Sequence, residues 1–201
     1  MTVYYYEGAK ILAPLTISSN EPFFDADTVS LKKQRASQGA QRWELSFNTL
    51  PKDNVAEAFI ASVNNLHLAD SMIMPQLQEV ENRFTLSGNI LTSNSSASGD
   101  LDVTMNNDGS NTGLLPKGYF IKFANHDKIY VVTNDNDFAG STNRTMNIFP
   151  ALTQTVPAQT AVYTSTNATF TFFRDIDNVK GITFTDGILS NQGTINLIEA
   201  V

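Results

Sequence analysis

Two histidines, His67 and His126, are the residues of this chain best suited by type to acid–base catalysis or metal binding. A catalytic histidine works beside a nucleophile or a second polar group, and a metal-binding histidine needs further ligands at a regular spacing. Neither histidine lies near a serine in a nucleophile motif or near a second histidine at metal-ligand spacing. We therefore expect structural roles for both: His67 near a helix end, where an imidazole can contact the last carbonyls, and His126 in a turn between two strands.

Aspartate pairs are a second candidate, because two carboxylates that flank a glycosidic bond can cleave it. The pairs with a spacing of two residues, which places both side chains on one face of a strand, are Asp100/Asp102, Asp135/Asp137 and Asp175/Asp177. The second and third pairs lie beside turn residues, where aspartate is common because its side chain bonds to nearby backbone. We expect turn roles for them and predict that the protein is not an enzyme.

No pattern in the sequence predicts a bound metal or cofactor. The loop that starts at Thr104 has Thr at the first ligand position of a calcium loop and Leu115 where a bidentate glutamate is needed. The chain has no cysteine, which removes disulfides, thiol catalysis and cysteine-ligated zinc. Its net charge of −7 disfavours general binding to nucleic acid.

The composition indicates a folded protein made of many short strands. The 201 residues are 41% hydrophobic but only 16% charged, and Asn, Thr and Ser take the place of the charged residues. Such a mixture suits strands joined by tight turns. No apolar run approaches the ~20 residues of a membrane helix, and the N-terminus does not look like a secretory signal. We expect synthesis in a cytoplasm and no membrane insertion.

The two ends of the chain predict an α+β domain. The alternation of Trp43, Leu45 and Phe47 with polar residues predicts a half-buried strand. A helix should follow from Pro51, because apolar residues recur at helical spacing on one face, namely Val55, Phe59, Val63 and Leu66. Residues 69–78 read as an irregular or extended link. Asp186-Gly187 predicts a tight hairpin turn, and a final strand should contain Ile195 and Leu197.

The middle of the chain predicts a small β module. The expected strands are 84–91, 101–105, 119–123, 129–133, 145–149, 160–163 and 169–173, and Gly, Asn, Ser, Asp and Pro clusters separate them. Strands at this spacing are typical of a small barrel or sandwich. We therefore predict a predominantly β α+β fold, in which residues 1–86 and 173–201 form one discontinuous domain and residues 87–172 form an inserted barrel.

Aromatic and methionine residues outside the catalytic candidates point to surfaces for protein contacts. Tyr, Phe and Met are favoured at protein interfaces, and they gather at Tyr4–Tyr6, Phe23-Phe24 and Met72/Met74. The alternative is that they belong to the core.

Three stretches carry a resemblance to a known family. They run from Ser37 to Phe47, where the predicted helix follows at Pro51, from Lys117 to Thr133, and from Asn147 to Leu152. In these stretches, and in the order of elements over nearly the whole chain, the sequence resembles the distal tail (Dit-type) proteins of long-tailed bacteriophages and related tail-tip or baseplate ring proteins.

The resemblance implies a virion protein that acts by assembly. It implies an oligomeric ring, usually a homohexamer, whose wall is a tail-tube-like α+β domain and whose inserted OB-like barrel points outward. Such rings join the tail tube to the tail tip or baseplate and anchor receptor-binding or fibre proteins during host attachment. The family has no catalytic residues to carry over. In such a ring we expect the terminal strands and residues 34–42 to lie near neighbouring subunits, with Gln38, Gln41 and Arg42 as interface residues.

Two other functions remain open from the residues. A carbohydrate-binding module would use the exposed face of an OB-like barrel and stack sugars on Tyr119, Tyr130 or Tyr163, unless these tyrosines fill the barrel. An envelope hydrolase would need carboxylates alone to suffice, and loss of glycan hydrolysis on Asp175→Asn would support it.

Overall fold

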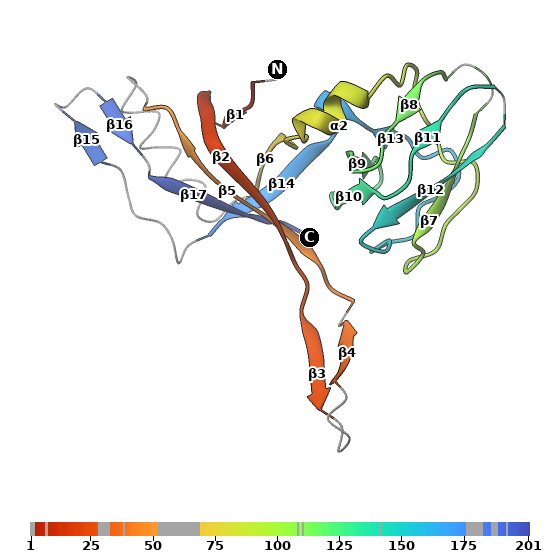
Figure 1. The fold of residues 1–201 in the computed structure, drawn as a ribbon, viewed down its shortest axis with the longest axis horizontal. Coiled ribbons are helices and arrows are strands. Elements are labelled where there is room, and N and C mark those ends of the chain that lie inside the picture. Colours follow the sequence, from red (N-terminus) through yellow and green to blue (C-terminus); the bar gives the residue numbers. More distant parts are fainter. Residues whose placement is uncertain are drawn as a thin grey trace. The chain divides into compact units, whose positions relative to one another are not determined.

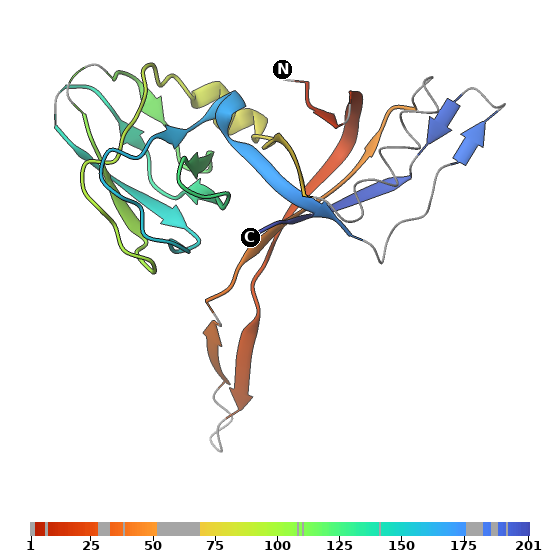
Figure 2. The same cartoon turned by 180° about the vertical axis from the view of Figure 1, so that it is seen from behind.

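The structure is a computed structural model, and it divides the chain into two compact units. It describes residues 3–6, 8–27, 33–37, 39–51, 69–107, 109, 111–140, 142–175, 183–185, 189–191 and 193–201. The unit made of Tyr5–Ala69 and Phe172–Glu199 is called the sheet unit below. The unit made of Met1–Tyr4, Asp70–Thr171 and Ala200–Val201 is called the central module. Figures 1 and 2 show the ribbon from opposite sides.

An antiparallel sheet forms the sheet unit, and both ends of the chain contribute to it. Its strands lie in the order β1 (Tyr5–Tyr6), β2 (Ala9–Asn20), β5 (Arg42–Thr49), β17 (Thr194–Glu199) and β14 (Thr169–Arg174). Strand β6 (Asp70–Ile73) is assigned to the central module. The pairing of β17 with β5, for example Leu197 opposite Leu45, confirms that the C-terminal strand returns to the N-terminal one.

The strand predicted around Trp43 is β5, and its alternation is that of a half-buried strand. Trp43, Leu45 and Phe47 are buried, whereas the residues between them are partly exposed. On the same buried face, Tyr6 packs edge-on against Phe47 with ring centroids 5.5 Å apart. A strand with this period of two presents one apolar and one polar face, so the sheet has a core side and a polar side.

Two further two-stranded sheets extend the sheet unit. One is β3 (Phe23–Asp27) with β4 (Lys33–Ser37), and the other is β15 (Thr183–Thr185) with β16 (Leu189–Asn191). The second pair confirms the hairpin predicted around Asp186-Gly187, although the turn residues themselves lie outside the described residues. The helix predicted after Pro51 also lies outside the described residues.

A short helix in the central module was not predicted. Helix α2 (Gln78–Arg83) directly follows the segment expected to be an irregular link, and that segment begins with β6. Gln78, Glu79 and Glu81 are good helix formers, and the acidic residues in the first turn suit the positive end of the helix dipole. The proline and methionines of the link obscured this short signal.

A five-stranded antiparallel sheet is the framework of the central module. Its order is β13 (Val162–Tyr163), β9 (Phe120–Phe123), β10 (Ile129–Val132), β12 (Arg144–Phe149) and β7 (Asp102–Met105), with β8 (Leu114–Leu115) and β11 (Asn136–Asp137) as a separate pair and η1 (Ser165–Asn167) before β14. These strands confirm six of the seven predicted ones. The strand predicted at 84–91 is wrong: only isolated bridges form, from Ser87 to Thr112 and from Leu91 to Ala161, and Gly88 between them has a positive φ of 99°.

The segment after those bridges links the two edges of the five-stranded sheet. On the β7 side, Ser93 N donates to Thr104 O at 2.8 Å. On the β13 side, Val162 N donates to Ile90 O at 2.9 Å. Inside, one apolar cluster fills the module and includes Tyr119, Tyr130 and residues of all five strands. These hydrogen bonds join the connecting segment to both edges of the sheet, and the closed barrel itself stays a prediction.

The fold as a whole is the predicted one, α+β and predominantly β. The two units resemble the predicted division, but residues 70–86 group with the central module and were assigned to the discontinuous domain from the sequence. The physical reason is that Val80, Phe84 and Leu86 pack against the core of the module. Whether these units act as ring domain and inserted domain stays a prediction.

Candidate assembly surfaces

The aspartates considered for catalysis make backbone contacts in the central module. Asp100 accepts a hydrogen bond from Ala97 N at 2.7 Å, and Asp137 accepts one from Ala139 N at 3.0 Å. Asp135 accepts from Lys117 N and pairs with Arg83, both at 2.8 Å, and these bonds lower the pKa of its carboxyl. The bond from Ala139 N to Asp137 is the predicted turn role, whereas Asp135 contacts residues that are distant in sequence. In the described part of the chain, no group of three or more His, Cys, Asp or Glu side chains could hold a metal.

The three tyrosines proposed to stack on sugars have different environments. Tyr119 and Tyr130 are 1% and 0% exposed and belong to the core of the module. A buried ring offers no face to a ligand, so these two tyrosines fill the module, which is the alternative stated above. Tyr163 on the edge strand β13 is 37% exposed. The glycan-contact prediction therefore narrows to Tyr163.

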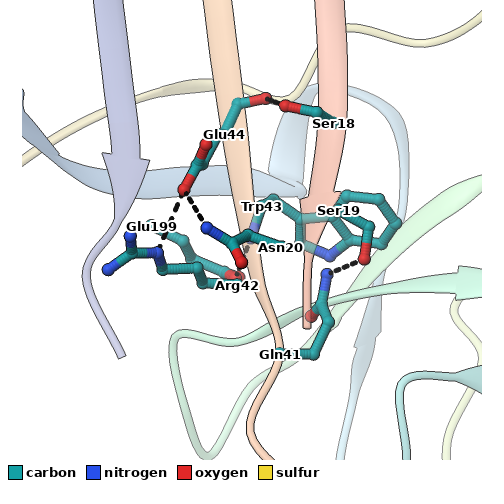
Figure 3. Close-up of polar contacts among 8 residues, drawn as sticks. All are labelled: Ser18, Ser19, Asn20, Gln41, Arg42, Trp43, Glu44 and Glu199. Carbon is teal, nitrogen blue, oxygen red and sulfur yellow. Dashed lines mark hydrogen bonds and ion pairs between the residues drawn. The ribbon is translucent and has the colours of Figure 1, made fainter. Parts of the chain in front are cut away.

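A polar cluster lies on the exposed face of the sheet unit where β2 and β5 pair (Figure 3). Glu44 is its centre: its Oε1 accepts from Asn20 Nδ2 at 2.9 Å and from Arg42 Nε at 3.1 Å. Half of the Arg42 side chain, 48%, stays exposed. An exposed ion pair of this kind adds at most ~1 kcal/mol to stability, so Arg42 can exchange partners at little cost.

The opposite face of the same strands is closed by a buried acid. Glu199 is 3% exposed, and its Oε2 accepts a hydrogen bond from the backbone N–H of Trp43 at 2.9 Å. A charged acceptor on a buried backbone N–H makes a strong contact. The bond ties the end of β17 to the start of β5 and fixes the position of the polar cluster on the exposed face.

The exposed face is hollowed beside the cluster. An open depression of about 630 Å³ is lined by residues of β2, β5 and β17, among them Ser18, Arg42, Glu44 and Asn196, and by Asp175, which follows β14. Its lining carries both signs of charge, and the described residues hold no group of three or more His, Cys, Asp or Glu side chains that could bind a metal. The depression suits contact with another polar surface better than chemistry on a small substrate.

The outer edge of β2 is a second candidate surface. β1 pairs with β2 only at Ala9 and Lys10, and no strand in the described part of the chain pairs with that edge from Ile11 to Asn20. A bulge between Leu12 and Thr16 interrupts the first part of the edge. Beyond the bulge no charged residue guards it before Glu21. Unguarded edges are templates for pairing with another chain.

The ribbon formed by β3 and β4 is the third candidate surface. It is a two-stranded sheet that continues from the β2–β5 pair, and both views show it extending beyond that pair (Figures 1 and 2). Phe23 is 45% and Phe24 66% exposed. The guanidinium carbon of Arg35 lies 5.2 Å from the centroid of the Phe23 ring, and two guanidinium nitrogens bind Asp25. Among the described residues, no cation is placed in this way over the Phe24 ring. An isolated ribbon of two strands is marginally stable in water.

The residues predicted to lie at an interface fall into three groups. Gln38 lies outside the described residues. Gln41 is 7% exposed because its Nε2 donates to Ser19 Oγ within the same chain at 3.0 Å, whereas Arg42 is exposed. Among the aromatic and methionine candidates, Phe23 and Phe24 are exposed, as a contact surface requires, but Met72 and Met74 are core residues at 7% and 0% exposure.

The β2 edge was missed from the sequence. No strand was predicted for residues 9–20, and Pro14 lies within this strand beside the bulge. The signal was present beyond it, because Leu15 and Ile17 alternate with Thr16 and Ser18.

Comparison with known proteins identifies the central module. Residues 82–165, less than half of the chain, match the family described as distal tail protein pb9, B domain. The match confirms the resemblance to phage distal tail proteins that the sequence predicts. No curated protein gives a significant match. None of the described helices has the length and apolar character needed to cross a membrane.

Proposed function

We propose that this chain, whose central module matches a distal tail protein domain, is a structural subunit of a bacteriophage tail that works as an oligomeric ring. The observation that carries the proposal is the match of residues 82–165 to the B domain of distal tail protein pb9. The ring is a homohexamer that joins the tail tube to the tail tip or baseplate. The protein thus acts within the virion by the shape of its assembly, without catalysis.

Three surfaces of the sheet unit support assembly into a ring. The β2 edge has no partner strand among the described residues, the β3–β4 ribbon offers exposed Phe24, and Arg42 is the first residue of β5, just after the ribbon. All three surfaces come from one stretch of the sequence, residues 11–42. A head-to-tail contact that uses such a surface on each subunit closes into a ring if the rotation between neighbours fits.

The central module then serves as the outward-facing part that anchors receptor-binding or fibre proteins. Its compact apolar core supports a rigid module, and a rigid module on a ring is a suitable attachment point. The carbohydrate-binding alternative now depends on Tyr163 as its stacking residue.

The oligomeric state of purified full-length chain tests the ring. We expect a ring mass in solution and its loss to a folded, smaller species in Phe24→Ser, because this variant removes an exposed apolar anchor without touching the core. Leu101→Ser is the matched control: Leu101 is 57% exposed, but it lies in the central module. A strictly monomeric wild-type chain, or equal dissociation by both variants, would contradict the proposed surface.

A further inference from the structure

The turn between β9 and β10 is bound to the 150–157 loop by a chain of side-chain hydrogen bonds in the central module. His126 Nε2 lies 2.7 Å from Tyr130 Oη. Tyr130 Oη in turn lies 3.1 Å from Thr153 Oγ1 and accepts a hydrogen bond from Thr153 N at 3.1 Å. His126 is 8% exposed and Tyr130 0%. The polar atoms of these two side chains are therefore satisfied within the protein, whereas Thr153 is exposed.

The proton positions of the neutral chain follow from its outer contacts. Asn125 Nδ2 donates to Thr155 O at 3.0 Å, which turns Asn125 Oδ1 toward His126 Nδ1 at 3.0 Å. An amide oxygen only accepts, so Nδ1 carries the hydrogen of the neutral imidazole. Nε2 is then an acceptor for the Tyr130 hydroxyl. The phenol oxygen accepts from both Thr153 N and the Thr153 hydroxyl.

Protonation of His126 leaves this chain with a second complete arrangement. Nε2 becomes a donor to Tyr130 Oη, which still accepts from Thr153 N. The Tyr130 hydroxyl then turns and donates to Thr153 Oγ1. Two bonds reverse their direction, and the hydroxyl hydrogen of Thr153 turns to solvent, because Thr153 is exposed.

We propose that His126, Tyr130 and Thr153 form a proton-responsive hydrogen-bond chain that reverses its direction on protonation and keeps the β9–β10 turn bound to the 150–157 loop in acid. The inference concerns the central module alone and does not depend on ring formation. Thr153 is the determining residue, because its hydroxyl is the group that changes from donor to acceptor.

The charges around His126 determine the pH at which the reversal occurs. Burial lowers the pKa of His126, neighbouring Asp127 raises it, and Lys122 of β9 lowers it. Lys122 is itself held by Asp127 at 2.6 Å and by Thr169 at 3.2 Å. Tyr130 is the titratable group that β10 contributes, and residues 150–157 contribute no charge. Reversal should therefore occur below pH ~6.5, the ordinary histidine value.

Histidine NMR titration of the full-length chain tests the proposal, with His67→Gln to assign the two histidine signals. In wild type we expect His126 to titrate below pH ~6.5 while the protein stays folded. Thr153→Val removes the hydroxyl that accepts from Tyr130 in the acid state. In the neutral state the same variant removes only a donor to Tyr130 Oη, which still accepts from Thr153 N, so the acid state loses more. The pKa of His126 should then fall by about one further unit.

Two further variants separate the hydroxyl from side-chain shape. Thr153→Ser keeps the hydroxyl and should keep the wild-type pKa, whereas Thr153→Ala should repeat the shift of Thr153→Val. Thr153 is exposed at its other side, so these substitutions leave the core intact. An unchanged pKa in Thr153→Val, an equal shift in Thr153→Ser, or unfolding that coincides with His126 titration would each overturn the proposal.

Discussion

The side-chain amide of Gln76 takes the place of a neighbouring strand for Phe120. Its Nε2 donates to Phe120 O at 3.0 Å, and its Oε1 accepts from Phe120 N at 2.9 Å. Its own backbone N–H donates to Tyr4 Oη at 2.9 Å. The contact joins residues 44 positions apart, so no local pattern predicts it. By contrast, the turn role of Asp137 could be predicted, because its partner, Ala139 N, lies two residues further along the chain.

Gln76→Ala should lower the free energy of unfolding by about 2–4 kcal/mol, because it leaves a buried N–H and a buried C=O without partners. Gln78→Ala is the control: the Gln78 amide bonds to Asn82 on the exposed face of α2, and its loss should cost about 0.5 kcal/mol or less. Urea denaturation of both variants measures the difference. Similar midpoints for the two variants would show that the Gln76 contact contributes little.

The hydroxyl of Tyr119 should ionise only at high pH. Burial is the main cause that raises its pKa to about 12, and a hydrogen bond to Ser165 partly offsets it. The folded-state value is above that of the unfolded chain, so the neutral phenol stabilises the fold below pH ~10 and this contribution is lost as the pH rises through 12. The phenolate absorbance of wild type minus that of Tyr119→Phe should show a midpoint near 12 while the protein is folded. A difference midpoint near 10 would contradict the burial.

At the scale of elements, most strands could be predicted because their period of two is local. β5, β9, β10 and β12 each join apolar alternation or apolar runs to flanking turn residues. The connection after α2, where a strand was expected at 84–91, could not be predicted correctly. It makes single bridges to different partners instead of one continuous ladder. Which strands pair, and which edge stays open, depends on tertiary contacts that a single sequence does not contain.

Substitution of Gly113 tests how closely the connection after α2 packs against its neighbours. Its φ is +99°, and a Cβ there would lie 2.3 Å from Thr85 O, a backbone atom. Gly113→Ala should therefore cost several kcal/mol, on the order of 3 or more, from strain and displacement of the connection together. Gly140→Ala has a similar φ of +84° but open space around the new Cβ, so about 1–2 kcal/mol is expected. Thermal unfolding compares them, and equal losses would contradict the tight packing.

At the scale of the whole molecule, each of the two units provides an observation in support of the proposed assembly role. The central module is a packed β unit that matches a distal tail protein domain. The sheet unit carries an open strand edge and an exposed aromatic ribbon on one continuous segment. The match of the module to a distal tail protein domain could be predicted from the sequence through the resemblance. The β2 edge could not, because an edge is defined by the strands that fail to pair with it.

Location in the virus particle is the measurement that tests this account most directly. Electron microscopy of particles labelled with an antibody against this chain should place the label at the end of the tail that is distal to the head. Several copies per particle are expected for a ring. Label that is absent from purified particles, or that lies on the capsid, would contradict the claim that the chain is a structural subunit of the distal tail.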